Sequence, residues 1–161
     1  MKSTASRLLL HLQKHINEES APINIHPQLQ ADGIIIGKFP LCHLLLMNDS
    51  NYPWFVLVPE REDIAEIHQL TEADQHQLIS ESSTLSRCIE QLFDADKINI
   101  AALGNIVPQL HIHHIVRYRT DAAWPAPVWG KLAAKPYTEG QLAQIIDKLK
   151  DESIAELEYR R

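Results

Sequence analysis

The chain of 161 residues has 45% hydrophobic residues, 22% charged residues and a formal net charge of -6. This composition is typical of a soluble globular protein with one domain, and it excludes an intrinsically disordered chain. The acidic balance also argues against a protein that neutralises the phosphates of a nucleic acid polymer, because that binding needs clustered Lys and Arg. A small anionic ligand is still compatible with this composition, through local hydrogen-bond donors.

The N-terminal segment and the cysteines bear on the cellular compartment. The apolar run Leu8–Leu10 is interrupted by His11 and Gln13, so it is too short for a signal peptide or a membrane-spanning helix. Cys42 and Cys88 lie in separate apolar segments without CxxC spacing. This spacing indicates buried reduced thiols and neither a disulfide framework nor a zinc knuckle. We therefore expect a cytoplasmic protein that does not engage a membrane.

The first part of the chain predicts a helix, a loop and a β-hairpin. Residues 5–16 have apolar side chains at near-helical spacing, and residues 18–33 contain two prolines and a glycine, which indicates a loop. Three apolar runs follow, at 34–39, 40–47 and 54–59. The last two runs flank NDSNYP, whose residues tolerate tight turns, so they predict an antiparallel hairpin.

The remainder of the chain predicts two helices and two strands, which makes the fold class α+β. TEAD, at Thr71–Asp74, offers an N-cap hydroxyl followed by an acid, and the helix that it starts is expected to reach Phe93. The two strands follow at 98–103 and 110–118. Prolines make the next segment, TDAAWPAPVWG, irregular. TEGQ, from Thr138, is a second possible capping box, and the helix that it starts is expected to span 138–158.

The stretch QLHIHH in the second of these strands concentrates histidines. Successive side chains of a strand point to opposite faces, so Gln109, His111 and His113 are expected to share one face. His114 is expected to point to the other face, which is otherwise apolar. The stretch therefore predicts two neighbouring imidazoles with an amide in line, and a third imidazole turned away from them.

Three interpretations of the His111 and His113 pair are open. A strand with a solvated polar face needs no function, since a period-two pattern carries little chemical information. A metal site needs a third ligand, and neither HExxH nor a carboxylate at ligand spacing supplies one. A histidine nucleophile acting on phosphorus needs donors for the phosphate oxygens. GNIVPQ, ahead of the strand, supplies Gly104, whose backbone can approach a ligand closely, and Asn105, whose amide can donate.

The stretch LGNIVPQLHIHHIVR resembles the signature of the histidine triad (HIT) family, His-φ-His-φ-His-φ-φ with φ apolar. Gln109, His111 and His113 match the three triad positions. WFVLVPEREDIAEIHQLTEAD is similar to the strand, turn and helix start that precede the motif, and WPAPVWG is similar to the Trp-Pro-rich tail of some branches. The resemblance covers about 33–130 as the core of a single domain, with an N-terminal helical extension at 1–32 and the C-terminal helix.

The resemblance implies an antiparallel sheet of about five strands with flanking helices, usually paired into a homodimer. It also implies a hydrolase or nucleotidyl transferase that cleaves at the α-phosphate of a purine nucleotide conjugate, either a phosphoramidate or a dinucleoside polyphosphate. No metal or other cofactor is expected. Carried over by position, His113 is expected to be the nucleophile that becomes transiently nucleotidylated, His111 to contact the phosphate, and Asn105 to face the scissile bond.

The chain departs from the family pattern at two positions. Gln109 stands where the first histidine is usual, which removes a titratable group while keeping a donor and an acceptor. General acid catalysis needs a group of suitable pKa, so a catalytically weak nucleotide-sensing or adaptor module is the alternative to an enzyme. His114 replaces an apolar residue, and we expect it to be a structural histidine that is hydrogen-bonded in the core or at a dimer contact.

Further residues are candidates for a nucleotide pocket. Asn48 and Asp49 end the first hairpin strand about where the family places a ribose contact, although NDSN is also a good turn sequence. Trp124 and Trp129 either line the pocket or hold a loop to the core. Arg117, on the same face as the triad, either attracts phosphate or forms a surface salt bridge.

Overall fold

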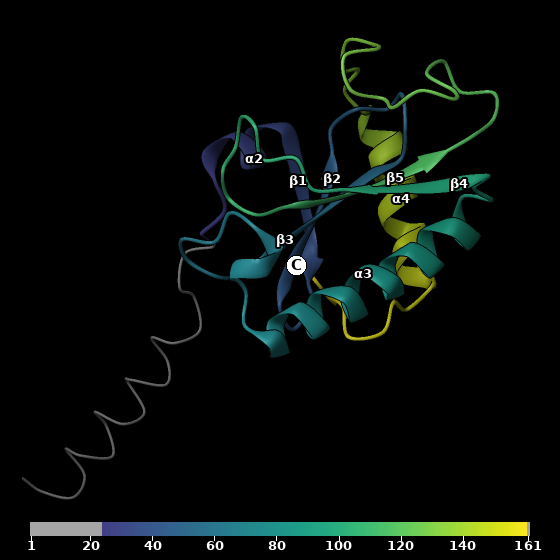
Figure 1. Cartoon of the computed structure of the whole chain (residues 1–161). Coiled ribbons are helices and arrows are strands. Elements are labelled where there is room, and N and C mark those ends of the chain that lie inside the picture. The colour runs from purple at the N-terminus through teal and green to yellow at the C-terminus, as the bar shows by residue number, and fades with distance from the viewer. Residues whose placement is uncertain (1–23, 161) are drawn as a thin grey trace, which may run out of the picture.

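The computed structural model describes residues 24–160, which form an α+β fold around one antiparallel sheet (Figure 1). The strand order is β4-β5-β3-β2-β1-β6. The strands are β1 (Gly33–Lys38), β2 (Cys42–Met47), β3 (Trp54–Pro59), β4 (Lys97–Ala101), β5 (Ile112–Arg117) and β6 (Glu158–Tyr159). The helices are α2 (Pro27–Asp32), α3 (Glu72–Leu92) and α4 (Glu139–Asp151), with a 3-10 turn, η1, at Ile67–Gln69.

The sheet carries a hydrophobic cluster on each face. Figure 1 shows α3 and α4 on one side of the sheet and α2 on the other. On the first side, Val116 of β5 packs with Leu85 of α3 and Leu149 of α4. On the second side, Val56 of β3 packs with Leu29 of α2. Since strand side chains alternate between faces, this burial of both faces explains why β2, β3 and β5 are rich in apolar residues throughout.

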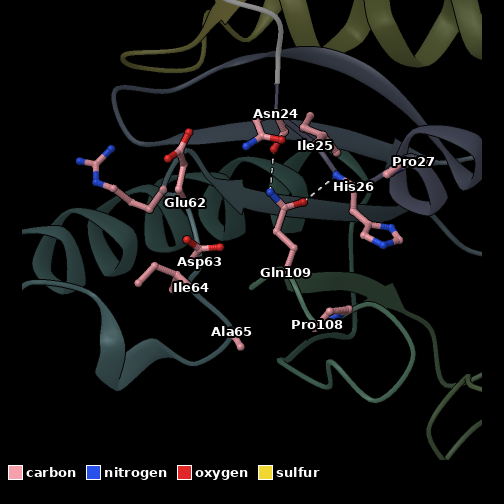
Figure 2. Close-up of a pocket in the computed structure, with 11 residues that line it drawn as sticks. Asn24, Ile25, His26, Pro27, Glu62, Asp63, Ile64, Ala65, Pro108 and Gln109 are labelled. Carbon is pink, nitrogen blue, oxygen red and sulfur yellow. Dashed lines mark hydrogen bonds between the residues drawn. The ribbon is translucent and has the colours of Figure 1, made fainter.

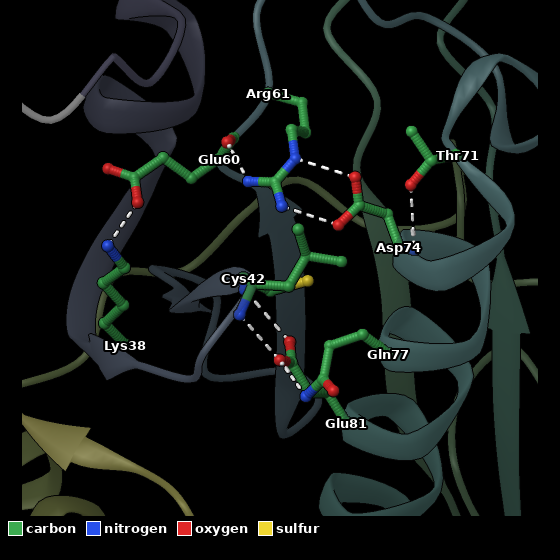
Figure 3. Close-up of polar contacts among 9 residues, drawn as sticks. Lys38, Cys42, Glu60, Arg61, Thr71, Asp74, Gln77 and Glu81 are labelled. Carbon is green, nitrogen blue, oxygen red and sulfur yellow. Dashed lines mark hydrogen bonds and ion pairs between the residues drawn. The ribbon is translucent and has the colours of Figure 1, made fainter.

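The predicted hairpin and the predicted long helix are confirmed. β2 pairs antiparallel with β3, with Leu44 opposite Leu57. Thr71 caps α3, its Oγ1 accepting a hydrogen bond from Asp74 N at 3.2 Å. The Arg61 guanidinium donates to the carboxylate of Asp74 at 2.8 and 2.6 Å (Figure 3). This ion pair ties the connection after β3 to the first turn of α3.

A buried carboxylate fixes the turn between β1 and β2 to α3. Glu81 is 1% exposed and accepts hydrogen bonds from the backbone N–H groups of Leu41 at 2.7 Å and Cys42 at 3.0 Å (Figure 3). Gln77 Nε2 donates to the same carboxylate at 2.9 Å. A carboxylate taken out of water needs such donors to offset its lost hydration. Cys42 is a buried free thiol, as expected, whereas the free thiol Cys88 is only half-buried.

The predicted loop at 18–33 is wrong for its last part, because α2 forms there. Pro27 stands in the first turn of α2, where a missing N–H breaks no helical hydrogen bond. His26 caps this helix, its Nδ1 accepting from Gln28 N at 3.1 Å. One of the two prolines that predicted a loop, Pro27, therefore starts a helix.

The last predicted helix is confirmed in its start and wrong in its end. Thr138 and Gln141 form the predicted capping box, but α4 stops at Asp151. The chain then continues to β6, which pairs antiparallel with β1 and adds a sixth strand to the expected sheet of about five. The helix predicted at 5–16 lies outside the described residues.

Candidate functional site

β5 carries most of the histidine cluster and lies between β3 and β4 in the sheet. Its alternation follows the prediction, since Ile115 packs in the cluster on the α2 side and Val116 in the cluster on the α3 side. His111 and His113 share one face, with ring centroids 4.9 Å apart. Their exposures are only 7% and 6%, so the interpretation as a solvated polar face is wrong.

The hydrogen bond of His111 sets the position of its ring proton. His111 Nδ1 lies 2.7 Å from the carbonyl oxygen of Gln109. Because a carbonyl oxygen only accepts, Nδ1 must carry the proton in this bond. Nε2 of the neutral ring then keeps its lone pair, and this atom is neither hydrogen-bonded within the described residues nor fully buried. His111 is thus held with Nε2 ready to act as a nucleophile.

His113 has the opposite arrangement of its ring nitrogens. Trp54 Nε1 donates to His113 Nδ1 at 2.9 Å, so the neutral ring carries its proton on Nε2. Burial, with the neighbouring charges of His111 and His114, lowers the pKa of His113 to about 3, which keeps the ring neutral at physiological pH. An Nε2–H group can donate a hydrogen bond but has no lone pair for attack. The geometry therefore argues against the expectation that His113 is the nucleophile.

His114 is a structural residue, as the sequence predicts. It is 0% exposed on the α3 side of the sheet, where its Nε2 lies 2.7 Å from Ser82 Oγ and its Nδ1 lies 3.2 Å from the carbonyl oxygen of Ile112. The carbonyl again requires a proton on Nδ1, so the Ser82 hydroxyl donates to Nε2. Burial lowers the pKa of His114 to about 4. Both ring nitrogens are satisfied, which explains how an imidazole replaces an apolar side chain here.

The side chain of Gln109 is engaged by backbone. Its Oε1 accepts from His26 N at 2.7 Å, and its Nε2 donates to the carbonyl oxygen of Asn24 at 2.7 Å (Figure 2). We call residues 24–27, which lead into α2, the N-terminal strap. The N-terminal strap, the loop 61–65 and the segment Pro108–Gln109 enclose a cavity of about 440 Å³. From the sequence, Gln109 is expected only to replace a catalytic imidazole. The sequence does not predict that the Gln109 side chain clamps the N-terminal strap by these two hydrogen bonds.

A second cavity, of about 470 Å³, borders Trp54 and Trp129, and we call it the tryptophan pocket. Trp129 packs edge-on against both Trp54 and His113, with ring centroids 5.3 Å apart in each pair, so the tryptophan pocket adjoins the imidazole pair. Its polar lining includes the side chains of Asp32, Asn48 and Asp49. No lysine or arginine is among its described lining residues. The sequence prediction included Asn48, Asp49 and Trp129 but missed Trp54 and Asp32.

Asn48 and Asp49 also hold one wall of the tryptophan pocket in place. Asn48 Oδ1 accepts from Tyr137 N at 3.0 Å, and Asp49 Oδ1 accepts from Lys135 N at 3.1 Å. The segment 130–136 is thereby fixed along the β2–β3 turn, and its alternate residues line the pocket: Gly130, Leu132, Ala134 and Pro136. Within the part of the chain that is described, Asn48 Nδ2 donates no hydrogen bond and Asp49 Oδ2 accepts none, which leaves one donor and one acceptor for a ligand.

Arg117 does not present a free guanidinium to the site. It is 1% exposed, and it donates to Asp121 at 2.7 and 3.0 Å, to Asn99 Oδ1 at 2.6 Å and to the carbonyl oxygen of Ala126 at 2.9 Å. Trp124 packs on this guanidinium, 5.7 Å from its ring centroid, and does not line the tryptophan pocket. Both residues were candidates for a nucleotide contact, each with a structural role as the alternative, and these contacts favour the structural role. The predicted surface salt bridge is instead a buried one.

Gly104 and Asn105 lie in the loop between β4 and β5. Gly104 has a φ of +75°, a left-handed conformation that favours glycine. The side chain of Asn105 is exposed and makes no hydrogen bond within residues 24–160. Neither residue lines the cavity beside Gln109 or the tryptophan pocket. Their predicted contacts with a ligand therefore stay predictions.

The described residues contain neither a candidate metal site nor a candidate membrane-spanning helix. No group of three or more His, Cys, Asp and Glu side chains in residues 24–160 is placed to hold a metal ion. No helix within this range is long and apolar enough to cross a membrane.

The chain is similar in sequence and in structure to known proteins. The model of the HIT domain family matches residues 28–120. A histidine triad protein from Marinobacter aquaeolei is similar in structure, with a TM-score of 0.80 and 50% identity over 84% of this chain and 100% of its own. A histidine triad protein from Bradyrhizobium japonicum is 44% identical over 81% of this chain and 98% of its own, with a TM-score of 0.79. The chain matches none of the curated proteins.

Proposed function

Because the chain belongs to the histidine triad (HIT) family of nucleotide-binding proteins, we propose that it cleaves a purine nucleotide conjugate at the α-phosphate through a nucleotidyl-histidine intermediate. The conjugate is a phosphoramidate or a dinucleoside polyphosphate. The observation that carries the proposal is the pair of hydrogen bonds that sets complementary tautomers on His111, just before β5, and on His113 in β5. His111 offers a lone pair and His113 offers a proton, with ring centroids 4.9 Å apart beside the tryptophan pocket.

The ring arrangement supports a division of roles that differs from the sequence expectation. His111 Nε2 attacks the α-phosphorus, and the positive charge that develops on the ring is stabilised by the bond from Nδ1–H to the carbonyl of Gln109. His113 Nε2–H donates to a phosphate oxygen, in the manner of an oxyanion donor. Because the pKa of His113 is about 3, its ring stays neutral over the whole physiological pH range, and its single proton stays on Nε2 as a donor.

The reaction balances without an additional reactant. In the first step a bond forms between His111 Nε2 and phosphorus, and the leaving nitrogen or oxygen departs with its electron pair and takes a proton from solvent. In the second step a water oxygen bonds to phosphorus, Nε2 leaves with its electron pair, and the surplus proton of the water returns to solvent. The sum is conjugate plus water to nucleoside monophosphate plus the protonated leaving group.

The tryptophan pocket supports a nucleoside as the group that is held. Its lining combines aromatic and aliphatic side chains with Asp32, Asn48 and Asp49, and residues 24–160 contribute no lysine or arginine to it. Such a lining suits an uncharged base and the hydroxyl groups of a ribose, whereas phosphate is better served by the donors at the imidazole pair. Asn48 and Asp49, which each keep one polar atom free, are the proposed ribose contacts.

The exposed edge of the sheet supports the expected homodimer. β4 is an edge strand, and Ile100 on it is 54% exposed. Leu103 and Ile106 in the loop that follows are 47% and 90% exposed. Apolar side chains gathered at an unpaired strand edge favour association with a second chain. We propose a second copy of this chain as the partner.

The test is turnover and covalent labelling with a fluorogenic AMP amidate and with diadenosine triphosphate. His111→Asn keeps a donor in place of Nδ1–H and removes the nucleophilic nitrogen, so it is expected to abolish acid-labile labelling and to lower kcat by about a thousandfold or more. His113→Gln keeps a donor near Nε2 and is expected to keep the label. His76→Gln, at an exposed position on α3, is the matched control.

One outcome would overturn the assignment of His111 as the nucleophile, and another would overturn the proposed reaction. Labelling that survives in His111→Asn and is lost in His113→Gln would return the nucleophile to His113. Wild-type protein that binds AMP but turns over neither conjugate would favour the alternative, a nucleotide-sensing module.

A further inference from the structure

Gln109 connects two parts of the site, one through its backbone and one through its side chain. Its carbonyl oxygen holds His111 Nδ1 at 2.7 Å. Its side-chain amide holds the N-terminal strap at two points, His26 N and the carbonyl of Asn24, both at 2.7 Å. Figure 2 shows the amide reaching across the cavity wall to this strap. One residue thereby links the imidazole pair to the chain that enters α2.

We propose that Gln109 is a positioning residue, which keeps α2 in a fixed place relative to His111 by clamping the N-terminal strap. α2 begins at the end of the strap and has only six residues. Its last residues, Ala31 and Asp32, line the tryptophan pocket. A shift of the strap is therefore carried to the wall of the pocket that is proposed to hold the nucleoside. In this respect the inference rests on the proposed function.

The geometry of the strap explains why an amide suits this position better than an imidazole. In extended backbone, the C=O of residue 24 and the N–H of residue 26 lie along the same edge. A primary amide presents an acceptor and a donor side by side, as a strand does to its neighbour. The two nitrogens of an imidazole point in diverging directions, so a histidine at position 109 can satisfy only one of the two strap groups.

The strap also has apolar anchors, so loss of the clamp is not expected to unfold the protein. Ile25 in the strap and Leu29 in the adjoining helix α2 are 3% and 4% exposed and belong to the hydrophobic cluster on this face. These contacts are non-directional and keep the strap on the sheet. The two hydrogen bonds of the Gln109 side-chain amide are directional, and they define the position of the strap along the sheet. A substitution at position 109 therefore tests whether the strap is held in place, and it is not expected to prevent folding.

The experiment compares Gln109→Met, Gln109→His and Gln109→Glu with wild type. Methionine keeps the length and removes both hydrogen bonds, and glutamate keeps only the acceptor for His26 N. Three quantities are measured: hydrogen exchange at the His26 amide, the affinity for AMP, and kcat and KM for a fluorogenic AMP amidate. Gln144→Met, at an exposed position of α4, is the matched control.

We expect Gln109→Met to exchange the His26 amide about tenfold faster and to raise KM and the Kd for AMP by about tenfold, with kcat changed by less than about threefold. Gln109→Glu keeps the acceptor for His26 N but sets a carboxylate oxygen against the carbonyl oxygen of Asn24, so its effect is expected to be at least as large as that of Gln109→Met. Gln109→His is expected to weaken AMP binding and to give no gain in kcat. Faster exchange with weaker AMP binding supports the inference even if wild type turns over no conjugate, an outcome that removes only the proposed hydrolysis.

Three results would overturn the inference. Unchanged exchange at His26 in Gln109→Met would show that the amide does not hold the strap. Faster exchange with unchanged KM and AMP affinity would show that the strap does not position the pocket. A fall in kcat at constant KM, or a gain in kcat in Gln109→His, would show that position 109 acts on the reacting groups directly.

Discussion

Replacing Trp54 by Phe keeps an aromatic ring at the start of β3 and removes the Nε1–H that donates to His113 Nδ1 at 2.9 Å. A neutral hydrogen bond contributes about 1 kcal/mol net, which is roughly a fivefold preference for the tautomer with its proton on Nε2. The variant also leaves Nδ1 without a donor in a ring that is 6% exposed, at a cost of about 1–3 kcal/mol. We expect kcat/KM for an AMP amidate to fall by about 5-fold to 30-fold.

The tautomer itself is read from the chemical shifts of the two ring nitrogens in protein labelled with 15N-histidine. Wild type is expected to show a protonated Nε2 and an unprotonated Nδ1 at His113, and Trp54→Phe to show a mixture. Trp129→Phe is the matched control, because Trp129 contacts the same ring edge-on, at 5.3 Å between centroids, and the bond from Trp54 persists. A Trp54→Phe variant with the nitrogen shifts and kcat/KM of wild type would refute the reasoning that Trp54 sets the donor at His113.

Two predictions concern stability. Burial lowers the pKa of His114 to about 4, so in the unfolded chain, where the pKa is about 6.5, this histidine binds its proton first. The contribution of His114 to stability should be complete above about pH 6.5 and fall by on the order of 3 kcal/mol as the pH drops toward 4. His113, with a pKa of about 3, should add a loss in the same direction. Urea unfolding at a series of pH values measures this loss, and a slope that His114→Gln leaves unchanged would count against it. Arg117→Met should lower the unfolding free energy by about 3–5 kcal/mol, because it leaves the carboxylate of Asp121 unpaired beside a buried site, with AMP affinity retained. Weaker AMP binding at undiminished stability would mean that the guanidinium contacts the nucleotide.

The parts of the fold that were predicted correctly depend on neighbours in sequence. The N-cap of α3 at Thr71 and the capping box of α4 at Thr138 are short-range patterns that appear in the structure as expected. The assignment of His111 and His113 to one face and His114 to the other follows from the period of two in a strand. These features were predictable because a helix cap and a strand face are decided within a few residues.

The sequence by itself determined the β2–β3 hairpin, the long helix α3, the start of α4, the face of each histidine and the family resemblance, but it did not indicate α2 or β6. Only the tertiary structure decided what each ring nitrogen and each polar side chain contacts. Trp54 lies 59 positions from His113, and Gln109 lies 83 positions from His26, so no local pattern indicates that these residues are hydrogen-bonded. Arg117 shares the triad face in sequence, yet its partner Asp121 and the carbonyl of Ala126 come from a loop that periodicity does not describe. A hydrogen bond has a direction as well as a partner, and the folded sheet sets both, so the proposal that His111 is the nucleophile rests on these hydrogen bonds and not on the sequence motif.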